Sequence, residues 1–211
     1  MFTGIVEEKG KIEMIKQSNQ ALQLKIQGEK VTEDVAIGDS ISVNGVCLTV
    51  TNFTKEWFTV DVIPETFRSS SLSTLKAQSM VNLERAMHAN GRFGGHFVSG
   101  HVDAVGTIER TWIEDNAKYY YITVPETHYV TLKGSVAVDG TSLTVFGVDD
   151  NGFTISLIPE TQAATILGDK KQGDIVNVEY DMLAKYMERL LRSSHQQPQG
   201  ITEEKLTQLG F

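Results

Sequence analysis

The chain has 211 residues, of which 40% are hydrophobic and 22% charged, and its net charge is −8 at pH 7. This composition is typical of a folded soluble protein with one large domain or two small ones. The acidic balance argues against nucleic acid or an anionic membrane as the partner, because binding to either needs a basic face.

The N-terminal segment and the cysteine content predict a cytoplasmic protein. Residues 1–10, MFTGIVEEKG, lack the basic region and apolar stretch of a signal peptide, and no apolar run approaches the roughly 20 residues of a membrane helix. The single cysteine, Cys47, cannot form an internal disulfide, which suits a reducing compartment.

The first 85 residues show the pattern of an antiparallel β domain. Residues 22–26 and 58–62 alternate apolar and polar side chains, the period of a half-buried strand. Asn44-Gly45 between them suits a two-residue hairpin turn, because both residues adopt positive φ readily. Several short strands in so few residues favour a closed Greek-key barrel, although periodicity alone does not give their number.

The same pattern then occurs a second time. Residues 4–12 match 100–108 at an offset of 96, and from residue 44 onwards the offset is 95. Asp139-Gly140 takes the place of Asn44-Gly45, and the segment IPET occurs at both 63–66 and 158–161. A period this long predicts two whole domains rather than the blades of a propeller or the turns of a solenoid.

Two segments lie outside the repeats. Residues 86–97 contain three glycines and predict a flexible connection between the two copies. Residues 181–193 place six apolar side chains on one face of a helix. After the polar segment 193–200, a short further helix is expected near residues 202–209.

The two copies differ in reactive side chains at matching positions. Such differences suit a reaction in which two bound molecules play unlike roles, but drift after duplication is the favoured explanation of any single pair. The differing pairs are Cys47 and Ser142, Asp61 and Ser156, Ile5 and His101, and Ile37 and Lys133.

These residues also have ordinary structural interpretations. Cys47 could be a small core side chain, and Lys133 an exposed turn lysine. Asp61, within an apolar strand, either faces solvent or has a function, since an unpaired buried carboxylate is costly. The repeated Pro-Glu-Thr could simply end a strand and begin a helical turn.

Two other kinds of site are rejected. His96 and His101 lie five residues apart but lack the additional ligands of a metal site, so no metal is expected. Residues 92–96, RFGGH, lack the glycine spacing and the strand–turn–helix setting of a dinucleotide-binding fold.

In combination, five motifs resemble the riboflavin synthase family over nearly the whole chain, to about Ser193. They are MFTGIV at 1–6, NGVCLT at 44–49, GGHFVSGHV at 94–102, DGTSLT at 139–144 and the two IPET segments. The resemblance implies an all-β fold of two tandem six-stranded antiparallel Greek-key barrels with a C-terminal α-helix. The expected domains are residues 1–96, residues 97–180 and a trimerisation helix with its tail, 181–211.

The resemblance also implies a transferase reaction. Two molecules of 6,7-dimethyl-8-ribityllumazine, stacked between the N-terminal barrel of one subunit and the C-terminal barrel of another, exchange a four-carbon unit without a cofactor. The products are riboflavin and 5-amino-6-ribitylaminouracil. A homotrimer is implied, and lumazine synthase is a further partner to test.

Site residues are carried over from the matching motifs in two groups. The first half-site is expected to contain Gly4, Ile5, Val6, Cys47, Leu48, Thr49, Asp61, Val62, Ile63, Pro64, Glu65 and Thr66. The second half-site is expected to contain Gly100, His101, Val102, Lys133, Ser142, Leu143, Thr144, Leu157, Ile158, Pro159, Glu160, Thr161 and Gln162. The catalytic candidates are Cys47, His101 and Ser142, with Phe2 closing over the bound pair.

Two rival functions share this fold. Antenna proteins bind a lumazine or a flavin without turnover, but their motifs are altered in one half, whereas here both halves keep Leu-Thr and Ile-Pro-Glu-Thr. The flavin-binding barrels of ferredoxin-reductase-like oxidoreductases continue into a nicotinamide-binding domain, for which this sequence has no room. Both comparisons favour the enzyme.

Overall fold

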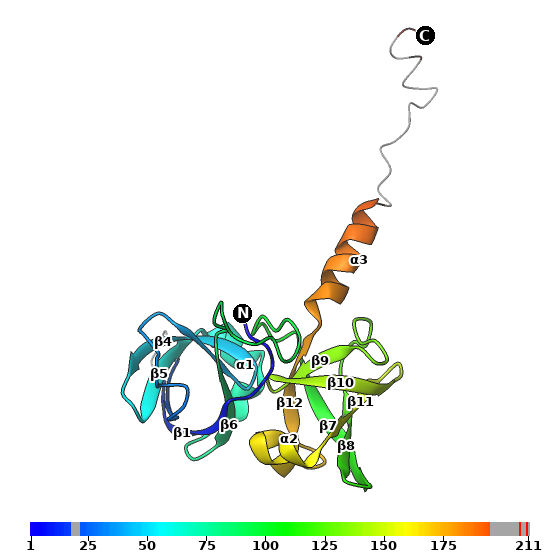
Figure 1. Cartoon of the computed structure of the whole chain (residues 1–211). Coiled ribbons are helices and arrows are strands. Elements are labelled where there is room, and N and C mark those ends of the chain that lie inside the picture. The colour runs from blue at the N-terminus through cyan, green and yellow to red at the C-terminus, as the bar shows by residue number, and fades with distance from the viewer. Residues whose placement is uncertain (18–21, 195–206, 208–209, 211) are drawn as a thin grey trace.

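The computed structural model describes residues 1–17, 22–194, 207 and 210. Two closed barrels of antiparallel strands lie side by side, and one helix projects away from them (Figure 1). Each barrel has six strands, which confirms the expected fold class. The two barrels form their cores from separate sets of buried apolar side chains.

The two barrels have the same topology. In the first, the strands neighbour one another in the order β1-β2-β5-β4-β3-β6, and in the second β7 to β12 repeat this order around the closed sheet. The first barrel comprises β1 (Glu8–Gln17), β2 (Leu22–Gln27), β3 (Ser40–Val43), β4 (Val46–Phe53), β5 (Trp57–Val62) and β6 (Met80–Arg85). The second comprises β7 (Ala104–Glu114), β8 (Ala117–Thr123), β9 (Ser135–Val138), β10 (Thr141–Val148), β11 (Gly152–Leu157) and β12 (Ile175–Tyr180).

Short helical segments connect β5 to β6 and β11 to β12. They are α1 (Pro64–Arg68) and η1 (Ser71–Thr74) in the first barrel, and α2 (Pro159–Ala164) and η2 (Ile166–Asp169) in the second. Both α-helices begin at the proline of an IPET segment, because proline already has the φ of a first helical residue and lacks only an unused N–H. The structural interpretation of this motif is therefore correct.

The predicted alternation and turns are present. Leu22, Leu24 and Ile26 face the core from β2, which pairs with the predicted strand β5. Both hairpin dipeptides adopt positive φ at both residues, with 48° and 81° at Asn44-Gly45 and 44° and 78° at Asp139-Gly140. These values are those of the turn type that matches the twist of paired strands.

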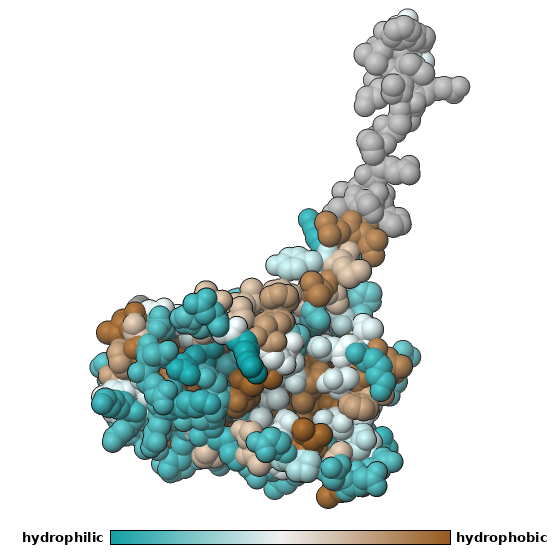
Figure 2. Space-filling model, in the orientation of Figure 1, coloured by the Kyte–Doolittle hydropathy of each residue, from teal (hydrophilic) through white to brown (hydrophobic). Residues whose placement is uncertain are grey.

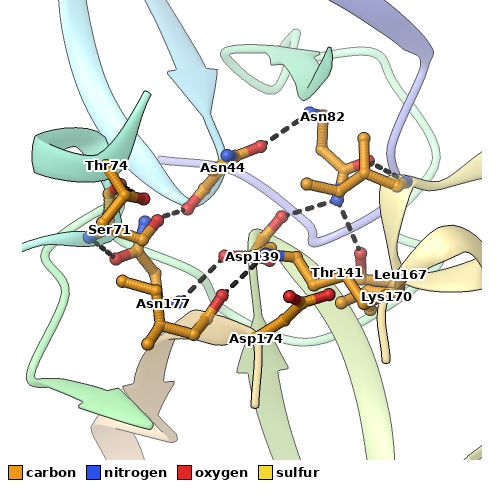
Figure 3. A network of polar contacts seen from close by, with 12 residues as sticks. Asn44, Ser71, Thr74, Asn82, Asp139, Thr141, Leu167, Lys170, Asp174 and Asn177 are labelled. Carbon is orange, nitrogen blue, oxygen red and sulfur yellow. Dashed lines mark hydrogen bonds and ion pairs between the residues drawn. The ribbon is translucent and has the colours of Figure 1, made fainter. Parts of the chain in front are cut away.

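Polar contacts related by an approximate two-fold axis join the two barrels (Figure 3). The Asn82 side chain donates to the Asp139 carbonyl and accepts from the Ile166 amide, both in the other barrel. Asn177 repeats this pattern in reverse, donating to the Asn44 carbonyl and accepting from the Ser71 amide. A contact that recurs with its two sides exchanged is the signature of a two-fold interface.

The two hairpin turns, at Asn44-Gly45 and Asp139-Gly140, differ in that only the second has an ion pair. The Asp139 carboxylate is fully buried and lies 3.3 Å from the Lys170 ammonium, which is the counterion that such burial requires. Burial raises the pKa of the Asp139 carboxyl, and Lys170 opposes that shift. The matching residues of the first barrel, Asn44 and Leu75, are neutral.

The segment between the barrels is tied to the N-terminus, unlike the flexible connection predicted. The Met87 amide donates to the Met1 carbonyl and the His96 amide to the Thr3 carbonyl. Phe2 and Val98 exchange backbone hydrogen bonds of 2.7 and 3.2 Å. The inter-domain boundary at residues 96 and 97 therefore stays a prediction, because residues on both sides of it pack against the N-terminal strand.

The final helix, α3 (Met182–Ser194), lies one residue from its predicted bounds. Its polar side is anchored to the second barrel, where Glu188 accepts a hydrogen bond from Tyr129 and Lys185 pairs with Asp103 at 2.8 Å. Its apolar side is exposed, including Leu190 at 70%, and joins an apolar band on the face between the barrels (Figure 2). Apart from Thr207, the further helix expected near 202–209 lies outside the described residues.

Candidate functional site

Cys47 lies at the start of β4, on the outward side of the first barrel. Leu48 points into the core, while Cys47 is half-buried and Thr49 is exposed, as the alternation of a strand requires. The Cys47 amide donates to the Gly100 carbonyl at 2.9 Å. The candidate surface is therefore the outer face of β4 rather than the barrel interior.

Ser142 has the matching position in the second barrel. Leu143 is buried, whereas Ser142 is half-buried and Thr144 is exposed on β10. The Ser142 amide donates to the Gly4 carbonyl at 2.7 Å. Each candidate strand thus begins with a backbone hydrogen bond to a glycine from the other half of the sequence.

This crossing corrects the expected grouping of the half-sites. Gly4 lies beside Ser142 of the second barrel, and Gly100 lies beside Cys47 of the first. Val102 packs against the core of the first barrel, which agrees with the exchange. The sequence repeat pairs each glycine with the strand of its own copy, but the two-fold arrangement brings each glycine against a strand of the opposite barrel.

Further candidate residues lie at the ends of β5 and β11 and in the helical turns that follow them. Ile63 and Ile158 are largely exposed at the starts of α1 and α2, together with the following Pro64, Glu65, Pro159 and Glu160. Thr66, Thr161 and Gln162 are half-buried, and the Gln162 side chain donates to the Leu157 carbonyl at 2.9 Å. Val62 and Leu157 are core residues, so a ligand can reach only their backbone.

Three charged or titratable candidates are exposed. Asp61 faces solvent and accepts a hydrogen bond from Gln23 at 3.0 Å, which settles its position but not its role. The exposed His101 has its amide bonded to the Ser99 hydroxyl at 3.3 Å. Lys133 has φ 64°, and its ammonium lies 4.5 Å from the centre of the Phe146 ring. All three side chains are accessible from solvent.

The position of Phe2 bears on its expected role of closing over the bound pair, which stays a prediction. Its side chain is completely buried and forms a small core with Val98 and Ala137, against which Cys47 packs. To close over a bound pair, this ring would have to leave its place beside Val98 and Ala137. In the structure it belongs to the cluster against which Cys47 packs.

The structure adds His96, which the sequence suggested only as a rejected metal ligand. His96 is buried, and its Nδ1 lies 2.7 Å from the Ser142 hydroxyl, while its buried Nε2 has no hydrogen-bond partner among the residues that the structure describes. Burial lowers the pKa of His96, because it disfavours the charged imidazole, although Asp181 and Glu179 oppose the shift. No spacing rule links these two residues across 46 positions, and the one available signal was the place of His96 in the motif GGHF.

Two cavities lie away from most of these residues. One of about 590 Å³ lies between β3, β6 and residues 86–92, and of the candidate residues Ile5 lines it. The other, of about 730 Å³, follows β1 and β2. The other candidate residues line neither cavity. Within the described part of the chain, no group of three or more His, Cys, Asp or Glu side chains could hold a metal ion.

The comparisons with known proteins agree with this geometry. The lumazine binding domain family matches residues 3–86 and 99–181, so the chain consists of two lumazine-binding domains. Riboflavin synthases from Bacillus subtilis (strain 168) and Actinobacillus pleuropneumoniae are 53% and 49% identical over 100% of both chains. That of Schizosaccharomyces pombe is 42% identical over 92% of this chain and 95% of its own. The chain belongs to the riboflavin synthase family.

Solved structures show the same fold. LumP complexed with riboflavin superposes with a TM-score of 0.78 over 85% of this chain and 99% of that one, at 24% identity. LumP complexed with 6,7-dimethyl-8-(1'-D-ribityl) lumazine gives a TM-score of 0.77. At this identity the likeness concerns the fold. Among the residues that the structure describes, no helix is long and apolar enough to cross a membrane.

Proposed function

We propose that the protein catalyses the riboflavin synthase reaction, in which two 6,7-dimethyl-8-ribityllumazine molecules give riboflavin and 5-amino-6-ribitylaminouracil. The observation that carries this proposal is the 53% identity to a riboflavin synthase over the whole of both chains. One lumazine donates a four-carbon unit and the other accepts it. All atoms and electrons of the two substrates appear in the two products, so the reaction needs no external oxidant.

The unlike side chains of the two barrels support unlike roles for the two lumazines. The C7 methyl of a lumazine is acidic, because its carbanion is delocalised into the ring. His101, exposed beside Gly100, is suited to move this proton, since an imidazole side chain can both accept and donate a proton. His96, whose Nδ1 lies beside the Ser142 hydroxyl, can accept a proton from it, which lets Ser142 deliver a nucleophile or hydrogen-bond the adduct on the second barrel. Cys47 has the matching position on the first barrel.

The open candidate faces support an assembly of several copies. A flat ring on the outer face of β4 or β10 is shielded from water only when a second surface covers it. We propose that the first barrel of one subunit faces the second barrel of another in a homotrimer, with the exposed side of α3 at its axis. Holding two lumazines face to face contributes about 7–11 kcal/mol in well-oriented reactions. Association with lumazine synthase and a cytoplasmic location stay predictions.

Purified protein incubated with the lumazine alone is expected to form riboflavin, measured by its absorbance and fluorescence. The rate is expected to be the same with a chelator present and with no nicotinamide cofactor added. Tight lumazine binding with no riboflavin after hours would instead assign the protein to the antenna type, which binds the chromophore without turnover.

Cys47→Ala and His101→Ala are expected to lower kcat about 100-fold or more, the usual size of an acid–base contribution, with little change in melting temperature. Neither side chain is fully buried, so its removal leaves no large cavity. His88→Ala removes an exposed histidine outside the candidate set and is the matched control. Near-native kcat in both variants would refute the argument from unequal copies.

A further inference from the structure

A buried glutamate in each barrel binds the short segment that precedes the first strand of that barrel. The Glu84 carboxylate, on β6, accepts hydrogen bonds from the Thr3 amide at 2.7 Å, the Thr3 hydroxyl at 2.8 Å and the Gly4 amide at 3.1 Å. Three donors around one buried carboxylate hold its charge and fix the position of the segment.

Glu179 repeats this arrangement on β12 of the second barrel. Its carboxylate accepts from the Ser99 amide at 2.7 Å, the Ser99 hydroxyl at 2.6 Å and the Gly100 amide at 2.9 Å. Glu179 is also buried. The two clamps therefore match donor for donor, although threonine in one is serine in the other.

The clamped glycines pass the contact to the opposite barrel. The amide of Gly4 is bound by Glu84 of the first barrel, while its carbonyl accepts from the Ser142 amide of the second. The amide of Gly100 is bound by Glu179, while its carbonyl accepts from the Cys47 amide of the first barrel. A single glycine therefore links the carboxylate of each barrel to the strand of the other barrel that carries Cys47 or Ser142.

The close approach at these glycines makes their position critical. Gly4 and Gly100 have φ of +76° and +83°, and a Cβ on either would lie 2.6 Å from the Ser142 Cβ or 2.5 Å from the Cys47 Cβ. A shift of a few tenths of an ångström in either segment must therefore be followed by the strand against it. The backbone and the candidate side chain move together.

We propose that Glu84 and Glu179 are positioning residues that act crosswise, so that the carboxylate of each barrel sets the geometry of the half-site on the other barrel. This inference rests on the proposed function only in treating the surfaces around Cys47 and Ser142 as substrate sites. It predicts that substituting the glutamate of one barrel changes the backbone of β4 or β10 in the other barrel.

Amide hydrogen exchange, measured residue by residue with NMR, tests this crossing without any substrate. In Glu84→Gln an amide group replaces one acceptor, so a backbone or hydroxyl donor loses its partner. The exchange rate of the Ser142 amide is expected to rise about tenfold or more, because losing a hydrogen bond to a charged group changes an equilibrium by about that factor or more. The Cys47 amide is expected to stay protected. Glu179→Gln is expected to give the opposite result.

Two milder variants keep the test decisive if a glutamine variant fails to fold. Thr3→Val and Ser99→Ala each remove one hydroxyl donor from a clamp and leave its carboxylate in place. They are expected to give the same crossed pattern with a smaller amplitude. Glu13→Gln, at a carboxylate of β1 that pairs with Lys25, is the matched control and is expected to change neither amide.

A second measurement connects position to chemistry. The alkylation rate of Cys47 by iodoacetamide is expected to rise in Glu179→Gln and not in Glu84→Gln, and both variants are expected to lower riboflavin formation. Exchange that rises only around the mutated residue's own strand, or equally in both barrels, would overturn the proposal. A crossed exchange pattern with unchanged turnover would also overturn it. Failure of wild-type turnover would refute the proposed function alone, because the exchange result stands without it.

Discussion

Asn82→Leu is expected to lower the melting temperature by roughly 5–20 °C. Leucine removes a buried side chain that bonds the Asp139 carbonyl and the Ile166 amide across the joint between the barrels. The Asp139 carbonyl and the Ile166 amide then stay buried without a hydrogen bond, which costs about 1–3 kcal/mol of stability for each group. In a chain of this length, each kcal/mol lowers the melting temperature by about 2–4 °C. Calorimetry measures the shift.

The two-fold arrangement supplies the controls for this variant. Asn177→Leu removes the matching bonds to Asn44 and Ser71 and is expected to destabilise the protein to a similar degree. Asn52→Leu makes the same substitution at an exposed position of β4 and is expected to change stability by less than about 0.5 kcal/mol. A shift of 2 °C corresponds to roughly 1 kcal/mol at most. If the melting temperature of Asn82→Leu lay within about 2 °C of the wild type, water or other groups would have to replace these hydrogen bonds.

Met187→Glu combined with Leu190→Glu is expected to convert the proposed trimer into monomers and to abolish most of the riboflavin-forming activity. Both side chains are more than 60% exposed on α3, whose polar side is already bound to its own barrel through Lys185 and Glu188. Burying each against other copies is worth about 1.5–3 kcal/mol, and the variant replaces this gain with repulsion between carboxylates. Sedimentation and riboflavin formation measure the two effects.

Truncation after Ala184 is expected to have the same effect, since it removes the exposed apolar side chains beyond the first turn of α3. Ile113→Glu is the matched control, because it places the same charge at an equally exposed apolar position on the β7–β8 hairpin. It is expected to leave assembly and activity unchanged. A monomeric truncated protein with full activity would show that the site is complete within one chain.

The architecture could be predicted from local patterns. The duplication, the strands at residues 22–26 and 58–62, the two hairpin turns and α3 all follow from periodicity and turn chemistry, which depend on near neighbours in the chain. The outward direction of Cys47 and Ser142 follows from the same alternation. The number of strands required the resemblance to a known family, because weak short strands between turns leave no clear period.

The tertiary structure alone decided how the two copies share their segments. A duplicated sequence allows residues 4–6 to lie on either barrel, and the hydrogen bonds of Gly4 and Gly100 show that both segments cross. The burial of Phe2 and the pairing of His96 with Ser142 have the same origin. Each depends on the two-fold packing of one barrel on the other, a contact between residues far apart in sequence that no local spacing encodes.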